Sequence, residues 1–90
     1  MKQVEYKIYT EAKPGIDKIV GNIFEAFTIN IGTGYWKGVR EGSAQITILC
    51  DDSPNSQTLV RQVSLEIKKQ NKQECVLITK NVLESEIIGG

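Results

Sequence analysis

Residues 28–50 read TINIGTGYWKGVREGSAQITILC, and this stretch decides the fold. Isoleucines alternate with polar residues at its start, and Ile46, Ile48 and Cys50 alternate with other side chains at its end. Alternation with period two is typical of strands. The two runs are joined by a short glycine-rich segment, which favours antiparallel pairing. The sequence therefore predicts a long hairpin, in which Gly38 and Gly42 take turn or bulge conformations.

Elements on both sides of the hairpin can be predicted from the same periodicities. Residues 3–10 alternate and predict a strand. Residues 16–27 repeat apolar side chains at helical period, so Ile23→Ala is expected to cost about 2–5 kcal/mol as a core change. Residues 54–69 favour a second helix, capped by Ser53 and begun by a proline, over the alternative of a strand.

The end of the chain carries two further strand signals. Residues 74–79 are a continuous apolar run, and residues 81–88 form a weaker strand pattern. The resulting order is β-α-β-β-α-β, which predicts one α+β domain over residues 1–90. We expect a ferredoxin-like fold, with two helices on one face of an antiparallel sheet. The tail could add an extra C-terminal edge strand.

The second face of this sheet needs a cover if apolar residues gather on it. We expect such an exposed strip to contain four residues: Tyr9, Leu49, Val76 and Ile78. Pairing of two copies would hide it, so the sequence predicts a homodimer joined through the sheet. The alternative is that residues 81–88 fold back and cover the strip within one chain.

Composition excludes several classes of function. Eleven basic and eleven acidic side chains give a formal net charge of zero, which argues against binding nucleic acid or an anionic membrane. The chain has no histidine, so the commonest general base and most transition-metal sites are missing. No metal and no cofactor are therefore expected. Neither a leader nor a membrane-spanning run is recognisable, and we expect a cytoplasmic protein.

The two cysteines lie in apolar, strand-like runs. Cys50 and Cys75 are therefore expected to be reduced and largely buried. A disulfide or redox pair is the alternative if the two strands are neighbours.

The turn of the hairpin holds the candidate binding residues, which are Tyr35, Trp36, Lys37, Arg40 and Glu41. An exposed tryptophan next to an arginine is typical of a binding site, and an aromatic ring with a cation can stack on a base and hold a phosphate. The structural explanation is that the tryptophan caps the core and that the arginine and the glutamate form a surface ion pair.

The hairpin and the second helix also resemble a known family. The shared pattern consists of Phe27, Thr28, Gly34, Trp36, Glu41, Ser43, Gln73 and Val76. It is similar to a family of small α+β proteins of unknown function from phages and bacteria. The resemblance implies the fold and a phage or mobile-element origin, and it implies no chemistry.

Three functional hypotheses follow. The first is a non-catalytic binding protein, a phage or mobile-element accessory factor that engages a host protein through the Gly32–Ser43 hairpin or the sheet. The second is a small-ligand, nucleotide-like binding protein with a pocket near Trp36 and Arg40. The third is a small enzyme that uses Tyr35, Lys37 and Glu41. A flat exposed tryptophan would favour the first, a cleft the second, and a buried glutamate with a raised pKa the third.

Overall fold

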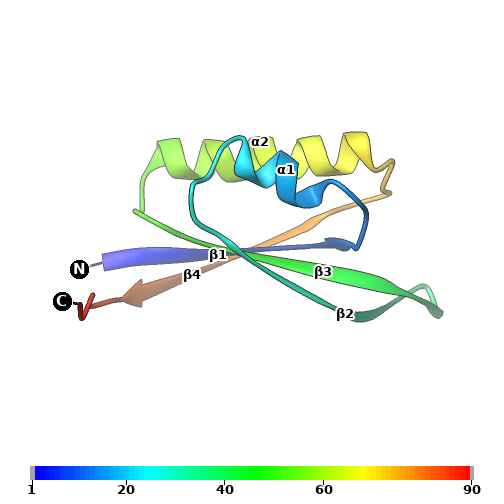
Figure 1. Cartoon of the computed structure of the whole chain (residues 1–90), viewed down its shortest axis with the longest axis horizontal. Coiled ribbons are helices and arrows are strands. Elements are labelled where there is room, and N and C mark those ends of the chain that lie inside the picture. Colours follow the sequence, from blue (N-terminus) through cyan, green and yellow to red (C-terminus); the bar gives the residue numbers. More distant parts are fainter. Residues whose placement is uncertain (1, 90) are drawn as a thin grey trace.

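The computed structural model describes residues 2–89, and its elements are β1 (Lys2–Glu11), α1 (Ile16–Gly21), β2 (Thr28–Trp36), β3 (Val39–Cys50), α2 (Pro54–Gln70) and β4 (Leu77–Glu84). Both helices lie on the same side of the sheet, as Figure 1 shows. The predicted ferredoxin-like α+β fold is confirmed.

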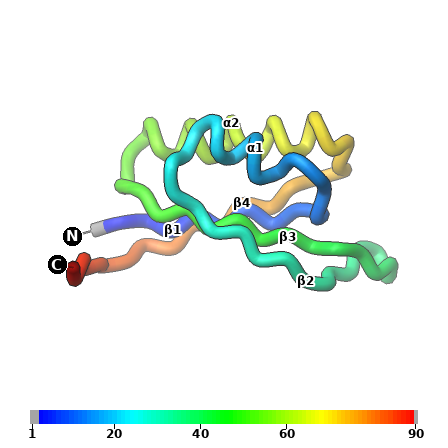
Figure 2. The backbone as a smooth tube through the Cα atoms, viewed as in Figure 1, coloured from blue at the N-terminus to red at the C-terminus, as the bar shows by residue number. Residues whose placement is uncertain are grey.

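The sheet is fully antiparallel, and its strand order is β2-β3-β1-β4. The two inner strands, β1 and β3, pair with each other along eight residue pairs, from Val4 opposite Cys50 to Glu11 opposite Ser43. The hairpin of β2 and β3 extends beyond the end of β1, which makes the molecule elongated (Figure 2). Strands β2 and β4 are therefore the two edges.

The core lies between the sheet and the helices. Strands β1 and β3 supply fully buried isoleucines, among them Ile8 and Ile46, which lie opposite each other in the ladder. Helix α2 adds Val60, Val63 and Ile67. Burying one such side chain contributes about 1.5–3 kcal/mol, so these contacts hold the two layers together.

The predicted second helix is confirmed. Its N-cap is Ser53, whose hydroxyl oxygen accepts a hydrogen bond from the backbone N–H of Ser56 at 3.1 Å. Pro54 occupies the first turn, where its missing N–H leaves no unpaired donor. No helix among residues 2–89 is long and apolar enough to cross a membrane.

The hairpin closes through a two-residue turn formed by Lys37 and Gly38. Their φ angles are 51° and 78°, and two consecutive positive φ values match the turn that suits twisted strands. The expectation for Gly38 is confirmed. Gly42 instead lies in the regular ladder opposite Thr33, so the expectation of a turn or bulge there is wrong.

Helix α1 is shorter than the predicted helix over residues 16–27. It ends at Gly21, and Asn22 provides the C-cap. Glycine disfavours helix continuation because it loses more backbone entropy than other residues. The next residues form an irregular segment in which Ile23 and Phe27 are only partly buried against the core. The prediction that these apolar residues face the core is therefore confirmed, whereas the predicted length of the helix is wrong.

The two strand signals near the end of the chain belong to one strand. Strand β4 runs from Leu77 to Glu84 and pairs with β1 over its whole length, so the described residues contain no separate fifth strand. This register also corrects the expected apolar strip. Ile78 lies opposite Ile8 and packs, like Val76, against the core.

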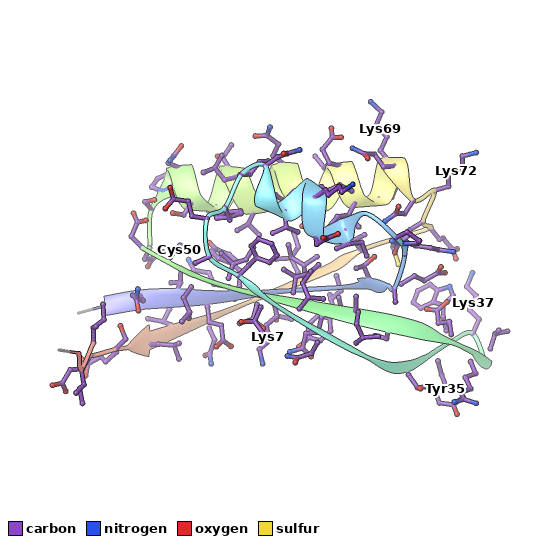
Figure 3. The ribbon with its side chains drawn as sticks, in the orientation of Figure 1. Lys7, Tyr35, Lys37, Cys50, Lys69 and Lys72 are labelled. Carbon is purple, nitrogen blue, oxygen red and sulfur yellow. The ribbon has the colours of Figure 1, made fainter. Side chains whose placement is uncertain are left out.

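The apolar residues on the open face of the sheet therefore differ from those of the predicted strip. Of the four residues of the predicted strip, only Tyr9 and Leu49 lie on it, where Tyr9 is opposite Leu77. The other odd-numbered positions of the inner strands are mostly polar or charged, for example Lys7, which points away from the helices in Figure 3. Leu49 and Leu77 are 53% and 59% exposed there, so this face still presents apolar side chains, although not the predicted strip.

Candidate functional site

A cavity of about 270 Å³ lies between the hairpin, the end of β1 and the connection from α2 to β4. All four strands supply side chains to it, among them Glu11 from β1, Trp36 from β2, Glu41 and Ser43 from β3, and Leu77 from β4. The ladder pairs Glu11 with Ser43 and Gly34 with Glu41, which places these positions on one face of the twisted sheet. The volume is close to the lower end of the about 300–1,000 Å³ typical of small-molecule sites.

Trp36 is held in place by the segment that precedes β4. Its indole N–H donates a hydrogen bond to the carboxylate of Glu74 at 2.9 Å. Lys37 Nζ pairs with the other oxygen of the same carboxylate at 2.9 Å and lies 5.8 Å from the centre of the indole ring. These two bonds lower the pKa of Glu74, with the lysine contributing most. These contacts connect the tip of the hairpin to the segment before β4, which is distant in sequence.

Two carboxyl groups in the lining of this pocket, those of Glu11 and Glu41, lie within hydrogen-bonding distance of each other. Loss of hydration raises the pKa of Glu41, and its hydrogen bond and charge repulsion with Glu11 raise it further. Glu11 has a lowered pKa because Lys13 pairs with it at 3.1 Å and Glu41 shares a hydrogen bond with it. Two adjacent carboxyl groups therefore hold a proton on Glu41 more readily than on Glu11. Within residues 2–89 no lysine or arginine forms an ion pair with Glu41.

Gln73 contributes a polar wall to the pocket. Its carbonyl oxygen accepts hydrogen bonds from the Thr10 hydroxyl and from the backbone N–H of Glu11, the latter at 3.0 Å. Its amide nitrogen is buried and finds no acceptor in the described part of the chain. A buried donor without a partner costs about 1–3 kcal/mol, so a ligand or water that accepts from it would be favoured.

The structure separates the predicted site residues into two groups. Trp36 and Glu41 line the pocket, and Lys37 reaches it through Glu74. Tyr35 borders the cavity, but the ladder pairs it with Arg40 on the opposite face of the hairpin, and 71% of Tyr35 is exposed. Figure 3 shows Tyr35 and Lys37 on opposite sides of the hairpin. Trp36, at 44% exposure, lies at a cavity and not on a flat surface.

Sequence reasoning missed the lining residues outside the hairpin. These are Tyr9, Thr10, Glu11, Gln73, Glu74, Cys75 and Leu77. One signal was present, because the glutamine belongs to the family pattern. Metal binding has no support among residues 2–89, where no three cysteine or acidic side chains are grouped as ligands.

The two cysteines differ, and the expectation that both are largely buried is wrong for Cys75. This thiol is exposed at the pocket, whereas Cys50 is half-buried and its pKa is raised, mainly by loss of hydration. We expect a thiol reagent to modify Cys75 rapidly and Cys50 slowly, because thiolate is the reactive form. Peptide mapping after timed labelling would measure both rates. Equal rates would contradict the placement of Cys50, and a Cys75→Ser control should leave only the slow phase.

No protein-family model matches the chain, and no curated protein matches its sequence. Solved structures share its fold. One is a phage S-adenosylmethionine (SAM) lyase in complex with S-methyl-5′-thioadenosine, with 19% identity over 88% of this chain and 80% of that chain, and a TM-score of 0.57. Another is a nitrogen regulatory PII-like protein from Thiomonas intermedia K12 bound to ADP, AMP and bicarbonate, with 14% identity, coverage of 97% and 98%, and a TM-score of 0.61.

A third similar structure is the divalent ion tolerance protein CutA1 from Ehrlichia chaffeensis, with 10% identity over 94% of this chain and 84% of that chain, and a TM-score of 0.60. At these identities the likeness establishes the fold alone. The similar structures include an enzyme, a nitrogen regulatory protein and an ion tolerance protein. This agrees with the general rule that a fold does not define a function.

Proposed function

We propose that the pocket at Trp36 binds a small organic cation that carries a flat, base-like ring, with S-adenosylmethionine as the leading example. The observation that carries this proposal is the charge of the lining. Three carboxyl groups line the cavity, from Glu11, Glu41 and Glu74, and no lysine or arginine is among the described lining residues. Lys13 pairs with Glu11 and Lys37 pairs with Glu74, which leaves Glu41 as the lining carboxyl group without an ion pair among the described residues. An aromatic wall beside such a carboxyl group attracts an organic cation.

Each part of the pocket can be assigned to a part of such a ligand. The ring of Trp36, held by Glu74, and that of Tyr9 offer apolar surface for an adenine-like group. The buried amide nitrogen of Gln73 can donate to a ligand acceptor after a small rearrangement. Glu41 has no cationic partner of its own and suits a sulfonium or ammonium group. The adenosine-derived ligands of the similar structures support the same ligand class.

Phosphate-bearing nucleotides fit the pocket less well. ADP and AMP are ligands of the PII-like protein, but a phosphate group here would meet Glu41, which has no ion pair among the described residues, and two carboxylates whose lysine partners are already engaged. Like charges at close range disfavour binding. The charge of the pocket therefore selects between two kinds of adenosine derivative.

The ligand proposal can be tested through two probes that the chain already contains. Trp36 is the only tryptophan, so its fluorescence should change as S-adenosylmethionine is added. The same ligand should slow the labelling of Cys75, and AMP should do neither at equal concentration. Arg40→Ala is the matched control on the far side of the hairpin and should leave both signals unchanged. No fluorescence change and no protection with S-adenosylmethionine would refute the proposal.

A second candidate function is cleavage of the same ligand, and the raised pKa of Glu41 favours it. Formation of S-methyl-5′-thioadenosine from S-adenosylmethionine by elimination breaks the bond between sulfur and the amino-acid chain, with the electron pair kept by sulfur. The neighbouring carbon of that chain loses a proton, and a carbon–carbon double bond forms. A carboxylate with a raised pKa can accept a proton during such a step. Chromatographic detection of S-methyl-5′-thioadenosine separates this from binding alone, and its absence with saturating ligand would support the prediction of a non-catalytic protein.

Engagement of a host protein by a phage accessory factor, the first of the hypotheses from the sequence, also has a supporting observation. Ile31, Tyr35 and Val39 are exposed large apolar residues on the hairpin. A protein partner held there should be lost with Ile31→Arg, whereas binding in the pocket should persist, because Ile31 does not line the pocket. Loss of both by the same substitution would contradict two separate surfaces.

A further inference from the structure

The outer edge of β4 carries an unusual amount of exposed apolar surface. Within the described residues β4 pairs with β1 alone, so its other side presents free backbone donors and acceptors. Val82 is 64% exposed although it lies opposite the fully buried Val4. Leu77 is 59% exposed, and Ile87 and Ile88 in the following segment are 80% and 89% exposed. An edge of this kind is a template for another strand.

We propose that two copies of the chain pair antiparallel through their β4 edges, with Val82 of one copy facing Val82 of the other. This inference is independent of the ligand proposed for the pocket. In such a pair, directly opposite side chains lie on the same face of the joined sheet. The arrangement is symmetric, so each contact away from the axis is made twice.

The sequence of β4 and its tail is complementary to itself in this register. Lys80 lies opposite Glu84 of the second copy, both on the helix-bearing face, so opposite charges meet. Leu77 lies opposite Ile87 of the second copy on the open face, and the next pair joins Val76 to Ile88. The residues that are exposed in one copy therefore become neighbours of apolar residues in the other.

The remaining acidic residue of the tail also meets opposite charge. Glu86 of the second copy would lie opposite Ile78, which lines a groove of about 190 Å³ between α2 and β4. Arg61 and Lys68 border the same groove. An apolar groove with basic side chains at its border matches a segment that alternates acidic and apolar residues.

Neighbouring registers lack this agreement. With Leu83 on the axis, Val82 would face Glu84 of the second copy and Leu77 would face Gly89. With Asn81 on the axis, Lys80 would face Val82, and Glu84 would face Ile78. Register in a sheet is specified by the match of side chains on each face, which selects the pairing through Val82.

The test measures assembly in solution by sedimentation velocity over a range of protein concentrations. We expect the unmodified chain to dimerise and Val82→Arg to weaken the dimer by at least about tenfold, because two cations would face each other on the axis. Ile31→Arg is the matched control, since Ile31 is 68% exposed on the opposite sheet edge. A monomer at all accessible concentrations, or a dimer that is broken by Ile31→Arg and not by Val82→Arg, would overturn the proposal.

A charge exchange tests the register itself. Glu84→Lys alone should weaken the dimer, and combining it with Lys80→Glu should restore it. Lys80 also binds Asp52 at 2.9 Å, so circular dichroism is needed to show that each variant remains folded. Failure of the folded double variant to recover would refute this register. Carbodiimide crosslinking should join Lys80 of one copy to Glu84 of the other, and a crosslink confined to other residues would also refute it.

Discussion

Replacing Ile46 with alanine is expected to lower the free energy of unfolding by about 2–5 kcal/mol. Ile46 is fully buried in β3, lies opposite Ile8 of β1, and has Ile29 of β2 on its other side. Removing three carbons there leaves a cavity that rigid neighbours on both strands cannot fill. A domain of this size has only a few kcal/mol of stability, so a large part of the population should unfold.

Chemical denaturation of the variant and of a matched control measures this effect. Ile31→Ala is the control, because it removes the same atoms from a side chain that is 68% exposed, and it should cost less than about 1 kcal/mol. Ile23→Ala should fall between the two, since Ile23 is only partly buried outside α1. Similar losses for Ile46 and Ile31 would show that the core is not where the structure places it.

Glu41→Lys should abolish binding of a cationic ligand, with a loss of at least about 100-fold in affinity, or about 2.7 kcal/mol. The substitution replaces the carboxyl group that has no cationic partner among the described residues with a positive charge at the same place. Calorimetry with S-adenosylmethionine would measure it. Glu25→Lys is the control, because Glu25 lies at a different surface hollow and its substitution changes the net charge equally.

The pH dependence of binding provides a second measurement at the same residue. Only the ionised form of Glu41 attracts a cation, and its pKa is raised, so affinity should increase as pH rises through that pKa and then level off. Glu41→Gln should remove this step. In the protein without ligand the raised pKa has the opposite consequence, since Glu41 stabilises the fold at low pH and this contribution is lost as pH rises through the folded pKa.

The sequence predicted those parts of the fold that depend on local periodicity and capping. Strand β1, the hairpin and α2 each combine a clear repeat with their own turn or cap, such as Ser53. The end of α1 at Gly21 was missed because apolar side chains continue at helical spacing in an irregular segment. The extent of β4 was missed because the polar residues 79–81 separate two apolar runs and therefore predicted two strands. In the structure these polar residues pair with β1 like the rest of the strand.

The sequence predicted the hairpin residues of the candidate site and none of its residues from other segments. Adjacent residues of a strand point to opposite faces, so Trp36 faces the pocket, whereas Tyr35 only borders it and lies on the face that carries Arg40. The partners of Trp36 and Glu41 are Glu74 and Glu11, and these come together only through the register of three strands. Register depends on long-range pairing, which periodicity within one strand does not reveal.

The bond between Trp36 and Glu74 has a consequence for the folding reaction. The hairpin can close early because its strands are adjacent in sequence, but the pocket also needs the segment before β4, whose pairing with β1 closes the longest loop in the chain. Species that lack docked β4 therefore have no binding site. A ligand of the pocket would bind the native state alone, so it should raise the thermal midpoint in proportion to the logarithm of its concentration and slow unfolding.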